Sequence, residues 1–160
     1  MLAGVDEAGR GPLAGPVVAA AVIMPCDQQC AQINDSKMIS GSLRTKLYQW
    51  IIAHCIDYSV SVVDHVLIDT INILQASLKA MHNAMCSLHT TADLYLIDGT
   101  QIVTDSRFVQ RAVVRGDQKS FSIACASIIA KVVRDRIMHQ LHARFPAWDF
   151  AAHKGYPTAA

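Results

Sequence analysis

Short runs of apolar residues recur along the chain and are typical of β-strands. The run Pro16–Ile23 is unbroken and rich in valine and alanine, as expected for a strand buried on both faces of a sheet. The segment Asp57–Val63 alternates between polar and apolar residues, which indicates a strand with one face toward solvent. The pattern predicts strands over residues 2–5, 16–23, 57–63, 94–97 and 109–114.

Three other segments repeat apolar residues every three or four positions, which is the spacing of one helix face. Ser40 is placed to cap the first of these helices. Ser120 opens the last one, which runs to about Arg144. The residues expected to face the core are Leu43, Leu47, Trp50, Ile51 and His54 in the first helix, Ile71, Leu74, Leu78, Met81, Met85 and Leu88 in the second, and Ile129, Val133, Ile137 and Leu141 in the third.

Strands and helices alternate, which predicts an α/β fold. The chain has 160 residues, a length that suits one domain with a proper core. The sequence contains neither internal repeats nor a low-complexity tract or linker. We therefore expect a single domain over residues 1–160.

The composition is that of a compact globular protein, with 17% charged and 52% apolar residues. The formal net charge is only +1. A strongly basic surface is the usual sign of a nucleic-acid binder, and the chain as a whole does not have one. If the protein binds nucleic acid, we expect a local basic patch helped by bound metal.

The five cysteines form no recognisable metal-binding or disulfide pattern. Cys26 and Cys30 are spaced almost as in a zinc knuckle, but no second pair follows them. No basic region precedes an apolar stretch at the N-terminus, and the run Leu13–Met24 is too short to span a bilayer. These features predict a soluble, reduced, cytoplasmic protein without membrane contact.

The segment Gly4–Pro12 carries the densest chemistry in the chain. It places Asp6 and Glu7 directly after the first predicted strand, followed by glycines and Arg10. Successive side chains of a strand face opposite sides, so we expect the glycines to turn the chain and bring Glu7 to the same site as Asp6. Arg10 is suited to phosphate, and acids beside a phosphate would repel it unless a cation lay between them. The segment therefore indicates a divalent metal.

Two further acids, Asp98 and Asp117, also fall at or just beyond the ends of predicted strands. In α/β folds, ligand sites lie in the crevice at strand ends. Carboxylates converging there would repel one another, and at least one pKa would rise. Divalent cations with oxygen ligands would remove this conflict.

Six motifs, in order, resemble those of one family. They are the string GVDEAGRGPLAGPVVAAAV, Asp35-Ser36-Lys37, Leu96-Ile97-Asp98-Gly99, Gly116-Asp117, Ser127-Ile128-Ile129-Ala130-Lys131-Val132 with Arg134-Asp135, and His153-Lys154-Gly155-Tyr156-Pro157. Together they resemble ribonuclease HII, the bacterial type 2 ribonuclease H, over essentially the whole chain. Their order makes the match far more specific than any one motif.

The resemblance implies a ribonuclease H-like fold, with a central mixed β-sheet flanked by α-helices. It assigns Asp6, Glu7, Asp98 and Asp117 as the catalytic, metal-binding set for two Mg²⁺ or Mn²⁺ ions. It implies an endonuclease that hydrolyses the phosphodiester 5′ of ribonucleotides in RNA–DNA hybrids or embedded in duplex DNA. The expected products carry 3′-hydroxyl and 5′-phosphate ends, and the expected roles are in replication and repair.

The resemblance also implies how the substrate is read. Gly9, Arg10 and Gly11 would contact the 2′-hydroxyl and neighbouring phosphates at the junction of RNA and DNA, which is the group that separates the two polymers. Tyr156 would pack on the sugar of the next, deoxy nucleotide. Ser36 and Lys37 lie in a polar turn that can hold a phosphate, although a solvated loop lysine is the alternative.

Lys131 and Arg134 are expected on the polar side of the last helix, where they either contact phosphate or keep the helix soluble. Met38 stands where the family usually has a second lysine, which lowers the expected affinity for the backbone. Relatives continue beyond the tyrosine motif, so we expect the C-terminal part of the family to be missing. We expect the protein to act as a monomer.

Two other functions are open. One is a nucleic-acid-binding module without catalysis, but unpaired acids would weaken such binding. The other is a phosphotransferase of a related fold, which also begins with a strand, Asp and Gly. It would need a second glycine-rich nucleotide loop, and the eight glycines provide none.

Overall fold

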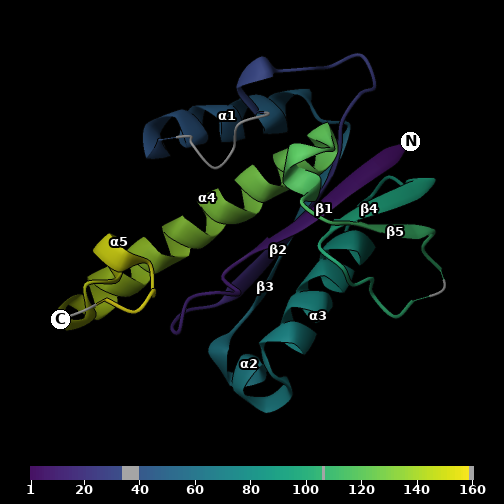
Figure 1. Cartoon of the computed structure of the whole chain (residues 1–160). Helices are drawn as coiled ribbons and strands as arrows, with labels where there is room; N and C mark the ends of the chain where they lie inside the picture. The colour runs from purple at the N-terminus through teal and green to yellow at the C-terminus, as the bar shows by residue number, and fades with distance from the viewer. Residues whose placement is uncertain (34–39, 106, 159–160) are drawn as a thin grey trace.

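The computed structural model describes residues 1–33, 40–105 and 107–158, which form an α/β structure (Figure 1). Its strands are β1 (Leu2–Ala8), β2 (Val17–Ile23), β3 (Asp57–Val63), β4 (Leu94–Asp98) and β5 (Gln110–Val113). Its α-helices are α1 (Gly41–His54), α2 (His65–Ile71), α3 (Ile73–Cys86), α4 (Phe121–Arg144) and α5 (Phe150–His153). Two short 3-10 helices, η2 (Gly116–Gln118) and η3 (Pro146–Trp148), flank α4.

The five strands form one mixed sheet in the order β3-β2-β1-β4-β5. Strands β1, β2 and β3 pair antiparallel, whereas β1, β4 and β5 run parallel. This arrangement confirms the predicted mixed sheet flanked by helices. The first strand lies at the centre, with β2 on one side and β4 on the other.

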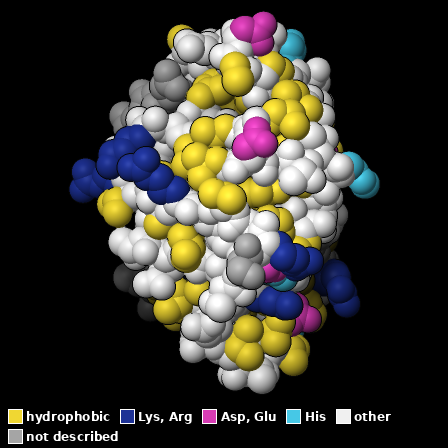
Figure 2. Space-filling model, turned by 90° about the vertical axis from the view of Figure 1, so that its right-hand side faces the viewer, with side chains coloured by type: hydrophobic (Ala, Val, Ile, Leu, Met, Phe, Trp, Pro, Cys, Tyr) yellow, Lys and Arg dark blue, Asp and Glu magenta, His cyan; other side chains and the backbone are white. Residues whose placement is uncertain are grey.

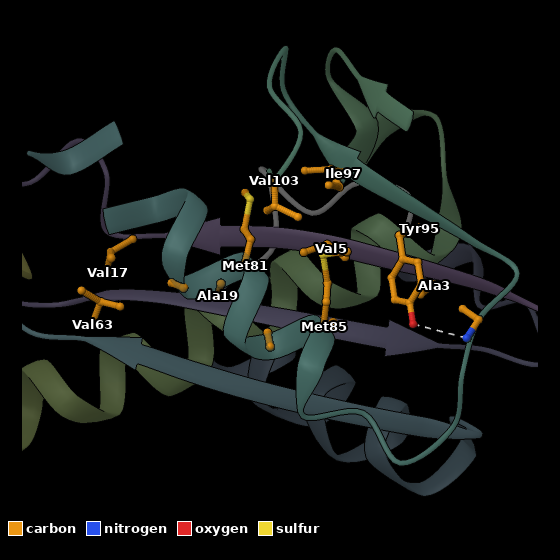
Figure 3. Packing of buried hydrophobic residues seen from close by; sticks show 14 of the residues in the cluster. Ala3, Val5, Val17, Ala19, Val63, Met81, Met85, Tyr95, Ile97 and Val103 are labelled. Carbon is orange, nitrogen blue, oxygen red and sulfur yellow. Dashed lines mark hydrogen bonds between the residues drawn. The ribbon is translucent and has the colours of Figure 1, made fainter. Parts of the chain in front are cut away.

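Helices α1 and α4 cover one face of the sheet, and α2 and α3 cover the other (Figure 1). Strand β2 is buried along its whole length, as predicted. Its residues Ala19 and Ala21 pack toward α3, while Ala20 and Val22 pack toward α4. In Figure 3, Met81 and Met85 of α3 lie over Val5 in the cluster on the α3 side.

Helix α4 lies directly on the backbone of β1 at Gly4. A Cβ atom on Gly4 would lie 2.1 Å from the carbonyl carbon of Ser122 and 2.2 Å from the nitrogen of Ile123. Real Cβ atoms do not come this close to backbone, so only glycine allows the observed distance between helix and strand. The contact sets the depth at which α4 covers the end of β1.

Two predicted elements differ in detail. β1 continues to Ala8 because its pairing with β2 extends to the partners Ala8 and Val18. The helix predicted from Ile71 to Leu88 corresponds to α3, which begins at Ile73, whereas Ile71 is the last residue of α2, a helix that was not predicted. Asn72 has φ 67° and ψ 164°, a strained backbone conformation that is otherwise essentially restricted to glycine. Its side chain accepts a hydrogen bond from the nitrogen of Gln75 and so caps α3.

The capping prediction for the first helix is confirmed. The hydroxyl of Ser40 accepts a hydrogen bond from the nitrogen of Leu43 at 3.4 Å, and α1 begins at Gly41.

Among the described residues, no helix has the length and apolar character needed to cross a membrane.

We expect Gly4→Ala to lower the free energy of unfolding by at least about 3 kcal/mol, because α4 must move away from β1 to admit the methyl group. Gly41→Ala is the matched control, since a Cβ there meets no atom within 4 Å. The control should leave stability unchanged or raise it by about 0.4–1 kcal/mol. Urea denaturation of both variants checks this, and equal midpoints would refute the close-packing argument.

Candidate active site

The acids lie at the carboxyl edge of the two central parallel strands. Asp6 and Glu7 are within β1, and Asp98 ends β4. Val5 and Ile97 are paired across the two strands, which brings the residues that follow them to the same edge. The prediction that the acids follow the end of the first strand is therefore wrong, because β1 includes both.

Backbone groups hold the carboxylates. Asp6 accepts a hydrogen bond from the nitrogen of Glu7 at 2.7 Å, and the nearby side chain of Ser127 on α4 acts to lower its pKa. Asp98 accepts a hydrogen bond from the nitrogen of Gly116 at 2.6 Å. Asp117, the next residue, is buried within η2. The strand ends and η2 thus bring the four predicted acids to one region.

The electrostatics of this region oppose full ionisation. Burial, together with the charges of Glu7 and Asp98, raises the pKa of Asp6 well above its ordinary value. Burial also raises the pKa of Glu7, although Arg10 acts in the opposite direction. The Arg10 Nη1 atom lies 3.6 Å from Glu7 Oε1. Glu7 Oε2 is buried and finds no hydrogen-bond partner among the described residues.

This donor set fits a hard divalent cation. The groups are carboxylates, which such cations prefer, and they repel one another without added positive charge. The buried Glu7 Oε2 atom has an acceptor position that a cation would satisfy.

A pocket of about 390 Å³ opens beside the acids. It brings together residues from β1, the loop after it, α1, η2, α4 and the C-terminal segment. Its lining is Glu7, Ala8, Gly9, Arg10, Gly11, Arg44, Asp117, Ser127, Ile128, Lys131, Arg134 and Tyr156. Most of the substrate-binding residues predicted from the sequence therefore share one cavity.

Two polar lining residues, Arg44 and Ser127, were not predicted as site residues. Ser127 was expected only on the polar side of its helix, and its position near Asp6 depends on how α4 packs against β1. Arg44 comes from α1, and its Nη1 atom lies 3.9 Å from Asp135 Oδ2 on α4. Nothing in the local sequence of α1 indicates that Arg44 faces the acids, because this depends on how the two helices pack.

The loop after β1 is joined to the C-terminal segment. The backbone nitrogens of Leu13 and Ala14 both donate to the carbonyl of Gly155, at 3.0 and 3.2 Å. This join places the ring of Tyr156 beside Gly11, where an added Cβ would lie 3.5 Å from Tyr156 Cε1. The ring is 48% exposed, so it can still contact a ligand.

The expectation that Arg134 lies on the polar, solvated side of its helix is wrong. Its side chain is only 1% exposed rather than on the solvated side of α4. The guanidinium donates to three backbone carbonyls, those of Pro16 (3.0 Å), Lys154 (2.9 Å) and Ala14 (3.0 Å). These three bonds join the loop after β1 to the C-terminal segment, and Arg134 also lines the pocket.

Lys131 lines the pocket, and its Nζ donates to Asp135 Oδ1 at 2.8 Å. Ser36 and Lys37 lie outside the described residues. Basic side chains on the face shown in Figure 2 form separate small groups rather than one continuous surface. This agrees with the low net charge.

The sequence model of the ribonuclease HII family matches residues 3–160. The chain belongs to this family. It is 50% identical to the ribonuclease HII of Endomicrobium trichonymphae over 157 residues, which are 98% of this chain and 75% of that protein. It is 49% identical to the ribonuclease HII of Caldicellulosiruptor saccharolyticus, over 98% of this chain and 76% of that protein.

The fold is similar to that of the ribonuclease H2 from Pyrococcus horikoshii OT3. The TM-score is 0.80 at 28% identity, over 99% of this chain and 81% of that one. Membership of the ribonuclease HII family makes the chain an endonuclease with ribonuclease H activity, a class that acts on nucleic acid and uses divalent metal ions. The phosphotransferase and the binding module without catalysis are thereby set aside.

The raised pKa of Asp6 gives a prediction for stability in the presence of a chelator. A carboxyl whose pKa is higher in the folded protein favours folding below its ordinary pKa, and this contribution is lost as the pH rises through the folded value. At pH 7.5, Asp6→Asn should therefore unfold with a free energy more than about 0.5 kcal/mol above that of the wild type, beyond the usual range of surface substitutions. The difference should shrink toward pH 4.

The exposed Asp69 supplies the control, since Asp69→Asn should differ little from the wild type at either pH. Thermal melts followed by circular dichroism across this pH range measure the three proteins. A constant difference between Asp6→Asn and the wild type would show that ionisation of Asp6 does not oppose folding.

Proposed function

We propose that the protein hydrolyses the phosphodiester bond on the 5′ side of a ribonucleotide, in RNA–DNA hybrids or embedded in duplex DNA. The products would carry 3′-hydroxyl and 5′-phosphate ends. The observation that carries the proposal is the pocket itself, which brings Glu7 and Asp117 together with Gly9–Gly11 and Tyr156. One cavity thus contains both predicted metal ligands and predicted readers of the sugar.

We assign Asp6, Glu7, Asp98 and Asp117 as the ligands of two Mg²⁺ or Mn²⁺ ions. Such ions, when bound, lower the pKa of a water and stabilise the charge on the leaving oxygen. The protein orients the carboxylates through hydrogen bonds from its backbone. The Glu7 nitrogen donates to Asp6, and the Gly116 nitrogen donates to Asp98.

Arg10 supplies the first positive charge that a substrate phosphate meets. Its side chain is half exposed and faces Glu7 across 3.6 Å, so it can turn from this weak pair to a phosphate. We assign the backbone of Gly9 and Gly11 to the 2′-hydroxyl, because side chains do not block the approach there. Arg44 and Lys131 also line the pocket and extend the positive charge toward neighbouring phosphates.

Tyr156 selects the nucleotide on the 3′ side of the ribonucleotide. Its exposed ring beside Gly11 is placed to pack on the sugar of that nucleotide. A second 2′-hydroxyl would be crowded by the ring, so a deoxynucleotide is preferred there. We infer that the protein acts as a monomer in the cytoplasm, where it removes ribonucleotides during DNA replication and repair.

A labelled DNA duplex with one embedded ribonucleotide tests the reaction. With Mg²⁺ or Mn²⁺, the wild type should nick the strand on the 5′ side of the ribonucleotide, and chelation should abolish the cut. Asp117→Asn should lower the rate at least about a hundredfold, which corresponds to ~2.7 kcal/mol of transition-state stabilisation. Its circular dichroism spectrum should stay that of the wild type.

The product ends distinguish the mechanisms. A 5′-phosphate at the ribonucleotide and a 3′-hydroxyl on the upstream fragment support hydrolysis by water. A 2′,3′-cyclic phosphate would show that the 2′-oxygen is the nucleophile, and the proposed reaction would be abandoned. Full activity of Asp117→Asn would remove this acid from the site.

Tyr156→Ala should lower kcat/KM on the single-ribonucleotide duplex about tenfold or more, as expected from the ~1–3 kcal/mol that aromatic contacts with nucleotides contribute. Tyr156→Phe is the matched control and should retain most activity, because it keeps the ring. The loss should be smaller on a duplex with several consecutive ribonucleotides. Equal losses on both duplexes would show that Tyr156 does not select the 3′ sugar.

A further inference from the structure

A second group of potential metal ligands lies between α3 and the segment that joins β4 to β5. His82 and Cys86 are four residues apart, on one side of α3, and Asp105 comes from the joining segment. Their ligand atoms all lie within 4.8 Å of one another. Cys86 is exposed, so an ion can reach the group from solvent.

The three ligands gather around a single ring nitrogen. His82 Nε2 is 2.8 Å from Asp105 Oδ2 and 3.6 Å from Cys86 Sγ, whereas Nδ1 is 4.0 Å from Sγ. A nucleophilic Cys-His-Asp group would instead place the acid and the thiol on opposite ring nitrogens. Ligands bound to zinc at about 2.0–2.3 Å lie roughly 3–4 Å from each other, and the distances to Nε2 are close to this range.

The surrounding residues fix the joining segment in place. The side-chain amide of Gln110 on β5 accepts from the nitrogen of Val103 at 3.0 Å and donates to the carbonyls of Val103 (3.0 Å) and Asp105 (3.1 Å). Phe108 packs edge-on against His82, with ring centroids 6.1 Å apart, and against Tyr95 at 5.0 Å. The ligands are thus positioned by the sheet and not by the ion.

Arg107 covers the group with its own positive charge. Its Nε donates to both oxygens of Asp105 at 3.0 Å, and its Nη2 lies 2.6 Å from Asp105 Oδ2 and 3.7 Å from Cys86 Sγ. These bonds hold the pKa of Asp105 below its ordinary value, so this ligand is ionised. The Arg107 side chain is 69% exposed and can swing into solvent.

We propose that His82, Cys86 and Asp105 bind one zinc ion, which displaces the guanidinium of Arg107. Thiolate, imidazole and carboxylate are all ligands of zinc, and three of them leave a fourth position for water. The site belongs to the α3 face of the sheet, whereas the active-site pocket is lined from α1 and α4. A bound ion would cross-link α3 to the segment that follows Asp98.

Cobalt titration of the reduced, chelator-treated full chain tests the proposal, with Mg²⁺ in excess to occupy the carboxylate site. The wild type should develop the near-ultraviolet absorption of a cobalt–thiolate bond at one equivalent, and Zn²⁺ should abolish it. Cys86→Ser should lose the band, and Asp105→Asn should weaken binding at least about tenfold. Cys26→Ser removes an exposed thiol elsewhere and should behave as the wild type.

The variant Arg107→Gln tests whether the guanidinium and the ion compete for the same ligands. If the guanidinium competes with the ion for the same ligands, its removal should tighten binding of cobalt and zinc. Weaker binding by Arg107→Gln would show that Arg107 builds the group rather than covering it, and would overturn the proposal. A wild type without the thiolate band, or a band that survives in Cys86→Ser, would overturn it as well.

Discussion

The buried guanidinium of Arg134 is the interaction on which the geometry of the pocket depends. It is bonded to the carbonyls of Ala14 and Pro16 in the loop after β1 and to that of Lys154 near the C-terminus. Burial lowers the pKa of Arg134, but an arginine stays charged at neutral pH. A buried charge is tolerated only when its donors are satisfied, so both segments must stay where the guanidinium reaches them.

The same interaction explains why the loop carries glycine at Gly9. Gly9 has φ +108°, and a Cβ there would lie 2.4 Å from both Arg134 Nε and the carbonyl oxygen of Pro16. The conformation of the loop that carries Arg10 therefore depends on the close approach of the Arg134 side chain to Gly9. The segment that carries Tyr156 is fixed by the same side chain, so the sugar-reading ring and the phosphate-reading loop are positioned relative to one common point.

The sequence predicted the strands and the ends of α1 and α4 well, because these elements follow from local periodicity and capping. It placed Asp6 and Glu7 after the strand because the pairing of Glu7 with Ala19 and of Ala8 with Val18 is not visible locally. The short helix α2 was missed because the apolar series recognised in the sequence begins only at its last residue, Ile71. Arg134 was predicted as polar surface since its partners lie about 20 and 120 residues away in the chain. The resemblance named the acids, whereas Arg44, Ser127 and the group around His82 depend on tertiary packing.

The central position of β1 has a consequence for how the chain is made. On the ribosome, β1, β2 and β3 can pair as soon as residue 63 is available, but β4 is synthesised some thirty residues later. Until then, the second edge of β1 is open, and open edges invite pairing with other chains. Asp6 and Glu7 place two charges just beyond residues 2–5, which later pair with β4, and charge at an edge is a recognised protection against such pairing. The carboxylates that crowd the finished pocket would thus also disfavour pairing of the incomplete sheet with other chains.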